Sequence, residues 1–288
     1  MKESMRESPG LRFRKAVEEE SPLQVVGTIN AYAAIMAKNS GFKAIYLSGA
    51  GVANASYGIP DTGLTTLDNV IEDARRITDT VDIPLLVDID TGWGNTMMIA
   101  RTIRAMQRAS VAAIHMEDQP FEKQCGHLPN PIVISTQKMV ERIQAAVDAK
   151  IDASFVIMAR TDAFRAEGLD KALERCLAYE EAGADMHFIE ALSSLEDYRL
   201  FTKSLKRPVL ANITEFGKTP LFTKEELASV GVSLILYPLS AWRAMNLAAL
   251  KVYEAIRTDG TQKKLLNEMQ TREELYGFLN YEVNHGRH

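Results

Sequence analysis

The chain has 288 residues, of which 46% are hydrophobic, and it carries a formal net charge of −5. This length can bury a large core and is compatible with one α/β barrel or with two smaller domains. The negative charge and the scattered Lys and Arg residues argue against a nucleic-acid partner, but they leave room for a small anionic substrate.

In chain order, the N-terminal region comes first. Residues 1–20 alternate charges and lack an apolar stretch, so we expect neither a signal peptide nor a membrane span there. The two cysteines, Cys125 and Cys176, have no disulfide-like spacing, which favours free thiols in a reducing compartment. We therefore expect a cytoplasmic protein with no membrane partner.

Eight apolar, β-branched runs follow, with helical segments between them. The runs occupy residues 23–30, 44–50, 84–90, 112–118, 155–162, 186–191, 208–215 and 234–240. Helical spacing is clear at residues 66–81, 135–150 and 169–183, and the last of these ends at Gly183. This alternation predicts an α/β fold, a (β/α)₈ TIM-type barrel. An open doubly wound sheet is the weaker alternative, because no glycine-rich dinucleotide fingerprint follows the first run.

Beyond the last predicted strand the chain has more helix than a barrel needs. Residues 242–259 form the candidate for the eighth helix, and residues 263–270 and 271–283 form two shorter amphipathic pieces. These pieces can pack on their own barrel or on a neighbouring subunit. We expect a single domain over residues 1–288, with 242–288 as a C-terminal helical extension, because no linker composition divides the chain.

Polar side chains stand at the carboxyl ends of the predicted strands, where barrel enzymes place their active sites. They are Tyr46, Ser48, Asp88, Asp90, His115, Glu117, Arg160, Asp162, Glu190, Asn212 and Thr214, and Gly49 follows Ser48 in the same position. Any single one is most simply a solvated charge or a helix cap, and His115 an inward barrel residue. Side chains alternate along a strand, so Asp88 and Asp90 share a face. Several carboxylates in one mouth repel one another unless a cation lies among them, which predicts a Mg²⁺ site, with Mn²⁺ possible.

The segment after the fourth predicted strand contains an unusual cysteine. Cys125 lies among charged residues, next to Gly126 and between Lys123 and His127. Lysine and a protonated histidine would stabilise a thiolate there, and glycine lets the backbone approach a ligand closely. The alternative is an exposed cysteine in a loop without chemistry. Cys176, in contrast, lies within an amphipathic helical segment, and we interpret it as a packing residue.

The segment EKQCGH resembles the K-[KR]-C-G-H signature of the isocitrate lyase and phosphoenolpyruvate mutase superfamily. The motifs VGTINA, AIYLSGA, LLVDID, HMEDQ, CGHLPN, VIMARTDA, LANITEFG and YPLSAWRAMN extend the resemblance over nearly the whole chain, and they are most similar to the methylisocitrate-cleaving branch. The resemblance implies a (β/α)₈ barrel, dependence on Mg²⁺, and a homotetramer that swaps a C-terminal helix between subunits. Such swapping would account for the surplus helices.

The resemblance also implies roles for individual residues. Asp88 and Asp90 resemble the metal-site carboxylates, with Asp61 and Glu117 supporting them through water. The residues that would hold a small tricarboxylate substrate are Ser48, Gly49, Ala50, Cys125, Gly126, Arg160, Glu190, Asn212, Ile213, Thr214, Arg243 and Arg272. Phe188, Leu236 and Pro238 resemble the version of the pocket that leaves room for an extra methyl group.

The activity implied by the resemblance is cleavage of methylisocitrate to pyruvate and succinate, a step of propionate catabolism. Tyr46 is the candidate base for the substrate hydroxyl, and Cys125 is the candidate acid, supported by Lys123, His127 and Arg160. Two alternatives remain: isocitrate lyase or another oxo-acid lyase, and a barrel that binds carboxylates without turnover.

Gln124 is the one position at which the signature breaks, because the family pattern has Lys or Arg there. Glutamine removes a positive charge beside Cys125, so an anionic intermediate should be less well stabilised. We expect Gln124→Arg to raise kcat/KM about ten-fold and to lower the apparent pKa of the thiol. Steady-state kinetics of the purified pair at low and high salt measure this. If the wild type and Gln124→Arg have equal kcat/KM values at each salt concentration, the charge at position 124 has no catalytic effect.

Overall fold

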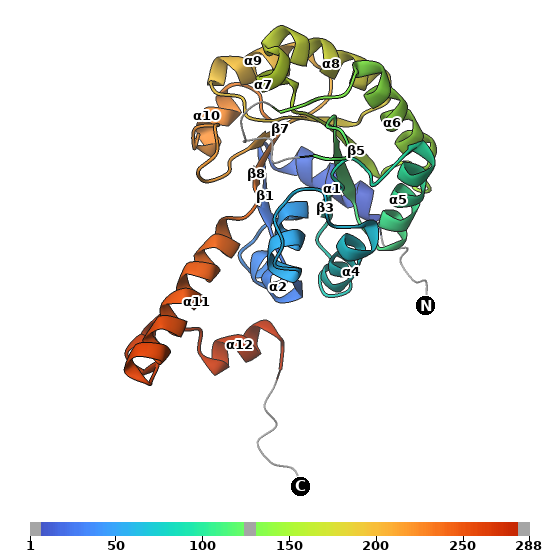
Figure 1. Cartoon of the computed structure of the whole chain (residues 1–288). Coiled ribbons are helices and arrows are strands. Elements are labelled where there is room, and N and C mark those ends of the chain that lie inside the picture. The colour runs from blue at the N-terminus through green and yellow to red at the C-terminus, as the bar shows by residue number, and fades with distance from the viewer. Residues whose placement is uncertain (1–6, 124–130, 282–288) are drawn as a thin grey trace.

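The computed structural model describes residues 7–123 and 131–281 and has a closed barrel of eight parallel strands. The strands are β1 (Leu23–Gly27), β2 (Ala44–Leu47), β3 (Leu85–Asp88), β4 (Ala113–Glu117), β5 (Val156–Thr161), β6 (Met186–Ile189), β7 (Val209–Asn212) and β8 (Leu234–Tyr237). Strand β1 pairs with β8, with Val25 opposite Leu236, and this pairing closes the barrel (Figure 1). The predicted barrel is therefore confirmed, and the open doubly wound sheet is excluded.

Helices surround the barrel and connect the strands (Figure 1). The longer ones are α1 (Pro9–Glu19), α2 (Ala31–Asn39), α4 (Leu67–Thr78), α5 (Thr96–Arg108), α6 (Thr136–Asp148), α8 (Leu169–Glu181), α9 (Leu195–Ser204) and α11 (Ser240–Asp259). The shorter ones are α3 (Gly49–Gly51), η1 (Val52–Ser56), α7 (Ala163–Glu167), α10 (Lys224–Ser229), η2 (Lys263–Glu268) and α12 (Arg272–Phe278). Within the described ranges, none of these helices has the length and apolar character to cross a membrane.

The helices form where the sequence supplies both a cap and an apolar face. Helix α4 begins with a reciprocal capping box between Thr66 and Asn69, and it buries Val70, Ala74 and Ile77. These three positions follow the helical repeat, so they share the face that packs against the outside of the barrel. Helix α8 buries Cys176, as expected for a packing residue.

Helix α1 was not predicted from the sequence, and it covers the amino-terminal end of the barrel. Ser8 caps the helix, and Phe13 is fully buried in the same cluster as the inward-facing residues of the strands. Arg14 donates to Asp185, which precedes β6, at a distance of 2.7 Å. Because this end is covered, a ligand reaches the barrel from the carboxyl ends of the strands.

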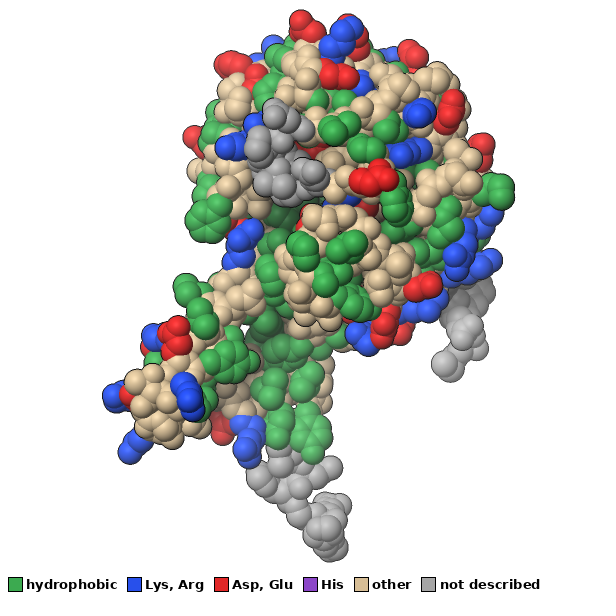
Figure 2. All heavy atoms as spheres, viewed as in Figure 1, with side chains coloured by type: hydrophobic (Ala, Val, Ile, Leu, Met, Phe, Trp, Pro, Cys, Tyr) green, Lys and Arg blue, Asp and Glu red, His purple; other side chains and the backbone are tan. Residues whose placement is uncertain are grey.

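Helix α11 extends away from the barrel (Figure 1). Residues 242–259 are helical as predicted, but within this chain α11 does not pack on its own barrel as an eighth helix, because none of its residues is buried. Its exposed apolar side chains are Met245, Leu247, Leu250, Tyr253 and Ile256. Figure 2 shows hydrophobic side chains gathered along this arm and on the surface beside it.

The end of the extension folds back towards α2. The ring of Phe278 in α12 meets Tyr32 edge to face, with ring centroids 6.2 Å apart. The Tyr32 hydroxyl donates to Gln270 at 2.7 Å. The piece predicted at 263–270 is a single short 3₁₀ segment, and the piece at 271–283 forms α12 over its first part.

Candidate active site

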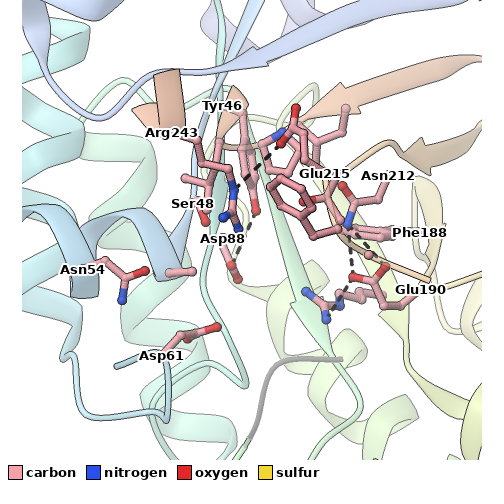
Figure 3. Close-up of a pocket in the computed structure, with 18 of the residues that line it drawn as sticks. Tyr46, Ser48, Asn54, Asp61, Asp88, Phe188, Glu190, Asn212, Glu215 and Arg243 are labelled. Atoms are coloured by element: carbon pink, nitrogen blue, oxygen red, sulfur yellow. Dashed lines mark hydrogen bonds and ion pairs between the residues drawn. The ribbon is translucent and has the colours of Figure 1, made fainter. Parts of the chain in front are cut away.

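A cavity of about 280 Å³ opens at the carboxyl ends of the strands (Figure 3). Predicted site residues that line it are Tyr46, Ser48, Ala50, Asp61, Asp88, Lys123, Arg160, Phe188, Glu190, Asn212, Thr214, Leu236, Pro238 and Arg243. The barrel thus brings together side chains that are far apart in the sequence. Cys125, Gly126 and His127 lie outside the described residues, as does Gln124.

The acidic end of the cavity is built around the end of β3. Asp88 accepts hydrogen bonds from the backbone amides of Asp90 at 2.9 Å and Gly49 at 3.2 Å. The Nζ atom of Lys123 lies 2.5 Å from Asp61 Oδ1 and 2.7 Å from Asp90 Oδ1. Lys123, which we expected beside the cysteine, therefore bridges two of the predicted metal-site carboxylates.

The two aspartates at this end have opposite pKa shifts. Burial, reinforced by the charge of Asp88, raises the pKa of Asp90 to about 7, although Lys123 opposes the shift. Burial also acts on Asp88, but the neighbouring positive charges outweigh it and hold its pKa down to about 2. The pair therefore does not hold two negative charges easily at neutral pH with Lys123 as its immediate cation.

These residues fit a divalent cation. Glu117 is buried, and its carboxylate oxygens accept no hydrogen bond from the described residues, although Arg160 Nη1 lies 3.3 Å away. Unsatisfied buried carboxylate oxygens and a raised aspartate pKa both indicate a shortage of positive charge. In the described part of the chain, no group of three or more acidic, histidine or cysteine side chains is already arranged to ligate a metal. Asp88 and Asp90 offer the oxygen donors, and a bound ion would replace Lys123 beside them.

Tyr46 and His115 form a pair beside Asp88. The phenol oxygen of Tyr46 lies 2.8 Å from His115 Nε2 and 3.5 Å from Asp88 Oδ2. The histidine ring stacks on Tyr46, and Phe188 meets it edge to face. Burial lowers the pKa of His115 to about 4, so the ring is neutral at pH 7, and burial beside Asp88 raises the pKa of Tyr46. Tyr46 is therefore a neutral phenol that can donate to, or exchange a proton with, a neutral imidazole.

The wall formed by β5 presents a guanidinium group. Arg160 donates from Nε and Nη2 to the two carboxylate oxygens of Asp162, at 3.1 and 3.0 Å. Its Nη2 also lies 3.2 Å from Glu190, and its guanidinium carbon lies 5.0 Å from the centre of the Phe188 ring. Negative neighbours raise the pKa of Arg160 in spite of its burial, so it is a permanent cation in the wall.

The loop after β2 provides backbone amides and open space. Ser48 caps α3, and its Oγ accepts from the backbone amide of Gly51 at 3.2 Å. A Cβ atom at Gly49 would lie 3.0 Å from Asp90 Oδ1, so glycine allows the backbone to approach the carboxylates closely. Ala50 lines the cavity beside them.

Strands β7 and β8 complete the wall. Asn212 donates to both carboxylate oxygens of Glu190 at 3.3 Å (Figure 3). Ile213 is buried in the hydrophobic cluster outside the barrel, so its side chain does not line the cavity although it was predicted among the substrate-binding residues. Its backbone amide is also occupied, because it donates to the backbone oxygen of Leu236 at 2.8 Å.

The two predicted arginines of the extension have different positions. Arg243, near the start of α11, lines the cavity, with Nε 3.9 Å from Glu215 and the guanidinium carbon 5.7 Å from the Phe216 ring centre. Arg272 begins α12, is exposed and does not line the cavity. Within one chain, the prediction that Arg272 contacts the same ligand is therefore not supported.

Several residues of the site were not predicted from the sequence. Asn54, Glu215, Phe216, Gly217 and Leu239 also line the cavity. Phe216 is 92% exposed, which is unusual for a phenylalanine, and its backbone is left-handed with φ of 61°. The glycine after it and the run of polar residues before it mark a loop, but they carry no signal for a cavity wall.

The chain is similar to known proteins along almost its whole length. The family model for phosphoenolpyruvate phosphomutase matches residues 13–257. A 2-methylisocitrate lyase from Shewanella oneidensis is 58% identical over 96% of this chain and 95% of that protein. A 2-methylisocitrate lyase from Escherichia coli is 56% identical over 95% of this chain and 93% of that protein.

Solved structures agree with this result. The crystal structure of 2,3-dimethylmalate lyase matches with a TM-score of 0.88 and 33% identity over 95% of this chain and 92% of that one. Oxaloacetate acetylhydrolase matches with a TM-score of 0.89 and 31% identity, over 94% of this chain and 93% of that one. The barrel, its cavity and these matches together show that the chain belongs to the phosphoenolpyruvate phosphomutase family, within the isocitrate lyase and phosphoenolpyruvate mutase superfamily.

Proposed function

We propose that this chain is a lyase that cleaves methylisocitrate to pyruvate and succinate with the help of Mg²⁺, or of Mn²⁺ in its place. The observation that carries the proposal is the near full-length match to 2-methylisocitrate lyases. The cavity supports it, because carboxylates that could hold a metal and the guanidinium of Arg160 line the same space of about 280 Å³. A small tricarboxylate needs both features, one for its hydroxyl end and one for its remaining negative charge.

The proposed reaction removes one proton from the substrate hydroxyl and adds one proton to the carbon on the other side of the broken bond. Asp88 and Asp90 would hold the metal ion, with Asp61 and Glu117 supporting it through water, and the ion supplies positive charge beside the substrate hydroxyl and its carboxylate. Tyr46 takes the hydroxyl proton as it passes its own phenol proton to the neutral His115 Nε2, which lies 2.8 Å from the phenol oxygen. A carbonyl forms as the carbon–carbon bond breaks, and this bond's electron pair moves to the succinate carbon.

The succinate carbon then receives a proton from the thiol of Cys125. Arg160 and the backbone donors beside Ser48 offset the negative charge that develops before this transfer. Asn212 and Thr214 hold a carboxylate of the succinate part, together with Arg243. Lys123 and His127 stabilise the thiolate left on Cys125.

Substrate preference is assigned to an apolar part of the wall. Phe188, Leu236 and Pro238 line the cavity together, with Phe188 and Leu236 almost fully buried. They offer contact to the extra methyl group of methylisocitrate. One methyl group in an apolar pocket is worth about 1–3 kcal/mol, so isocitrate should be a poor substrate rather than an inert one.

The test is to incubate the purified chain and Mg²⁺ with methylisocitrate and, separately, with isocitrate. Pyruvate release from methylisocitrate should exceed glyoxylate release from isocitrate by about ten-fold or more in kcat/KM. A preference for isocitrate would identify an isocitrate lyase. Binding of either compound without any product would favour the barrel that binds carboxylates without turnover.

The proposal includes a homotetramer in the cytoplasm with an exchanged C-terminal arm. The outward-facing side chains of Gln24, Val26 and Tyr237, on β1 and β8, are only partly buried, whereas every residue of the other strands is buried. These two strands are neighbours in the barrel, and α11, the helix that follows β8, buries none of its residues against them. We place the apolar face of α11 from a second copy over these two strands. The same exchange would bring Arg272 of one copy to the cavity of the other.

Substituting charged residues for leucines on the apolar face of α11 is expected to dissociate the oligomer. Leu247 and Leu250 are 71% and 52% exposed in the single chain, and burying each leucine contributes about 1.5–3 kcal/mol. Leu247→Glu combined with Leu250→Glu should therefore weaken assembly by at least about 100-fold. Light scattering after size-exclusion chromatography measures the mass. Glu254→Gln, on the same helix, is the control and should leave the mass unchanged, and a doubly substituted chain that still assembles would contradict the exchange.

A further inference from the structure

A buried carboxylate outside the cavity connects β4 to β5. Asp118 follows Glu117 directly at the end of β4, and its side chain is fully buried. Its carboxylate accepts hydrogen bonds from the Thr161 hydroxyl at 2.7 Å, the Tyr179 hydroxyl at 2.8 Å and the backbone amide of Asp162 at 2.9 Å. Two of these three donors belong to the end of β5, so Asp118 fixes the backbone there.

Arg175 compensates the charge of this carboxylate. Its Nη1 lies 3.4 Å from Asp118 Oδ2 and donates to the backbone oxygen of Ile134 at 2.8 Å. The backbone amide of Ile134 in turn donates to the backbone oxygen of Asp118 at 2.8 Å. Burial, together with the charge of Asp162, raises the pKa of Asp118 to about 6, so it remains mainly ionised at pH 7. A buried ionised carboxylate with this many donors is held in one orientation.

The network continues from Asp118 to the cavity wall. Asp162, whose amide Asp118 accepts, uses both of its carboxylate oxygens to grip Arg160 Nε and Nη2. A two-pronged contact of this kind fixes the plane of the guanidinium as well as its position. The remaining nitrogen, Nη1, is then directed towards Glu117, 3.3 Å away, at the inner side of β4.

We propose that Asp118 is a positioning residue for catalysis, which orients Arg160 through the backbone of Thr161 and Asp162. The inference rests on the proposed function for its kinetic consequence, because Arg160 is the cation that would face the developing negative charge. A guanidinium shifted by about 1 Å can lose about 100-fold in rate, so a side chain with no contact to substrate can control turnover.

Asp118→Asn is the first test. In one orientation, the NH₂ group of asparagine faces the donors of Thr161, Tyr179 and Arg175. In the flipped orientation, it faces the backbone amide of Asp162. Either way, hydrogen bonds that hold the end of β5 are lost. We expect kcat/KM for methylisocitrate to fall by about 10- to 100-fold, as is common for residues behind a catalytic ligand. The loss should lie mainly in kcat, because Arg160 remains present but is poorly aligned.

Asp185→Asn is the matched control, because Asp185 holds the opposite end of β5. Asp185 accepts hydrogen bonds from Arg14, Lys150 and the backbone amide of Ile157, near the start of β5. This variant weakens a comparable number of hydrogen bonds, which are partly buried, but lies away from the cavity. Its Tm should fall about as much as that of Asp118→Asn, whereas its kcat/KM should stay within about three-fold of the wild type. Equal loss of activity in the two variants would mean that Asp118 acts through stability alone.

A double-mutant cycle with Arg160→Lys separates positioning from general damage. If Asp118 acts through Arg160, Asp118→Asn should cost less than about three-fold in the Arg160→Lys background. A full 10- to 100-fold loss in that background would overturn the proposal. If Asp118→Asn fails to fold, Thr161→Val enters the same cycle with the same criterion; it removes the hydroxyl that donates to Asp118 and accepts from the Ala163 amide, and leaves the carboxylate in place.

Binding of oxalate with Mg²⁺, measured by titration calorimetry, distinguishes failure of this inference from failure of the proposed function. Oxalate is a small dianion that should contact Arg160 without any turnover. Non-additive losses of oxalate affinity in the cycle would support the positioning role even if the wild-type chain released no pyruvate. Additive losses, or no oxalate binding by the wild type, would overturn the positioning role whatever the kinetics show.

Discussion

Replacing Cys125 with serine is expected to abolish most of the turnover while leaving substrate binding intact. A thiol has a pKa near 8.5 and can give up its proton at neutral pH, whereas a serine hydroxyl is a far weaker acid. General acid catalysis typically contributes about 10²- to 10⁴-fold, so we expect kcat to fall by that amount. The loss should appear in kcat with little change in KM, because the hydroxyl occupies nearly the same volume as the thiol.

Titration calorimetry with methylisocitrate and Mg²⁺ would show that the Cys125→Ser variant still binds. Cys176→Ala is the matched control, since Cys176 is a fully buried thiol of α8 whose pKa is raised by burial. That variant should lose about 1 kcal/mol of unfolding free energy and none of its activity. Wild-type turnover by Cys125→Ser would remove the acid role from the cysteine.

The barrel could be predicted from the sequence because its signals are local. Each strand is a short apolar run, and residues two apart share a face, so the pairing of Asp88 with Asp90 and the gathering of strand ends in one mouth follow from periodicity. Helix α1 carried a usable signal that we did not use. Ser8 is a good N-cap and Pro9 fits the first helical turn, but the buried stripe of Gly10, Phe13 and Ala16 is narrow and lies among charges.

The rest of the site depends on contacts between distant segments. Lys123 reaches Asp61 from another part of the chain, and no spacing rule predicts that this lysine stands between carboxylates. Glu215 and Phe216 become part of the wall only because α11 begins beside them and places Arg243 over the ring. The periodicity alone leaves the direction of α11 open for a similar reason. An apolar helix face shows that something must cover it, but the pattern does not distinguish the chain's own barrel from a second copy.

The charges on the described residues explain why a metal should matter for stability as well as for chemistry. Asp90 has a raised pKa, so in the metal-free protein its ionised form lowers the stability of the folded state as the pH rises towards 7. A divalent cation beside Asp88 and Asp90 reverses this effect. Mg²⁺ should therefore raise the Tm of the wild-type chain, by mass action on the folded state.

Asp90→Asn is expected to abolish both this thermal response and turnover. Asp90 has a left-handed backbone with φ of 49°, a conformation that asparagine adopts readily, whereas alanine would add strain of about 1 kcal/mol or more. Asparagine also removes the repulsion with Asp88, so the metal-free variant should be no less stable than the wild type at pH 7, even without the ion pair to Lys123. It offers a neutral oxygen in place of a carboxylate, and we expect the Mg²⁺ affinity to fall by at least about 100-fold.

Thermal unfolding and calorimetric titration with Mg²⁺, each with and without substrate, measure this prediction. Asp73→Asn is the control, because Asp73 is also a buried aspartate but bonds Ser56 and Arg76 on the outside of the barrel. That variant should lose stability yet keep the full Mg²⁺-dependent rise in Tm, since its carboxylate lies away from the cavity. A Tm rise of wild-type size in Asp90→Asn would remove Asp90 from the metal site. If Asp90→Asn loses the Tm response but keeps normal turnover, the ion is not needed for the reaction. The reaction would then proceed without the positive charge that Asp88 and Asp90 are proposed to hold beside the substrate hydroxyl.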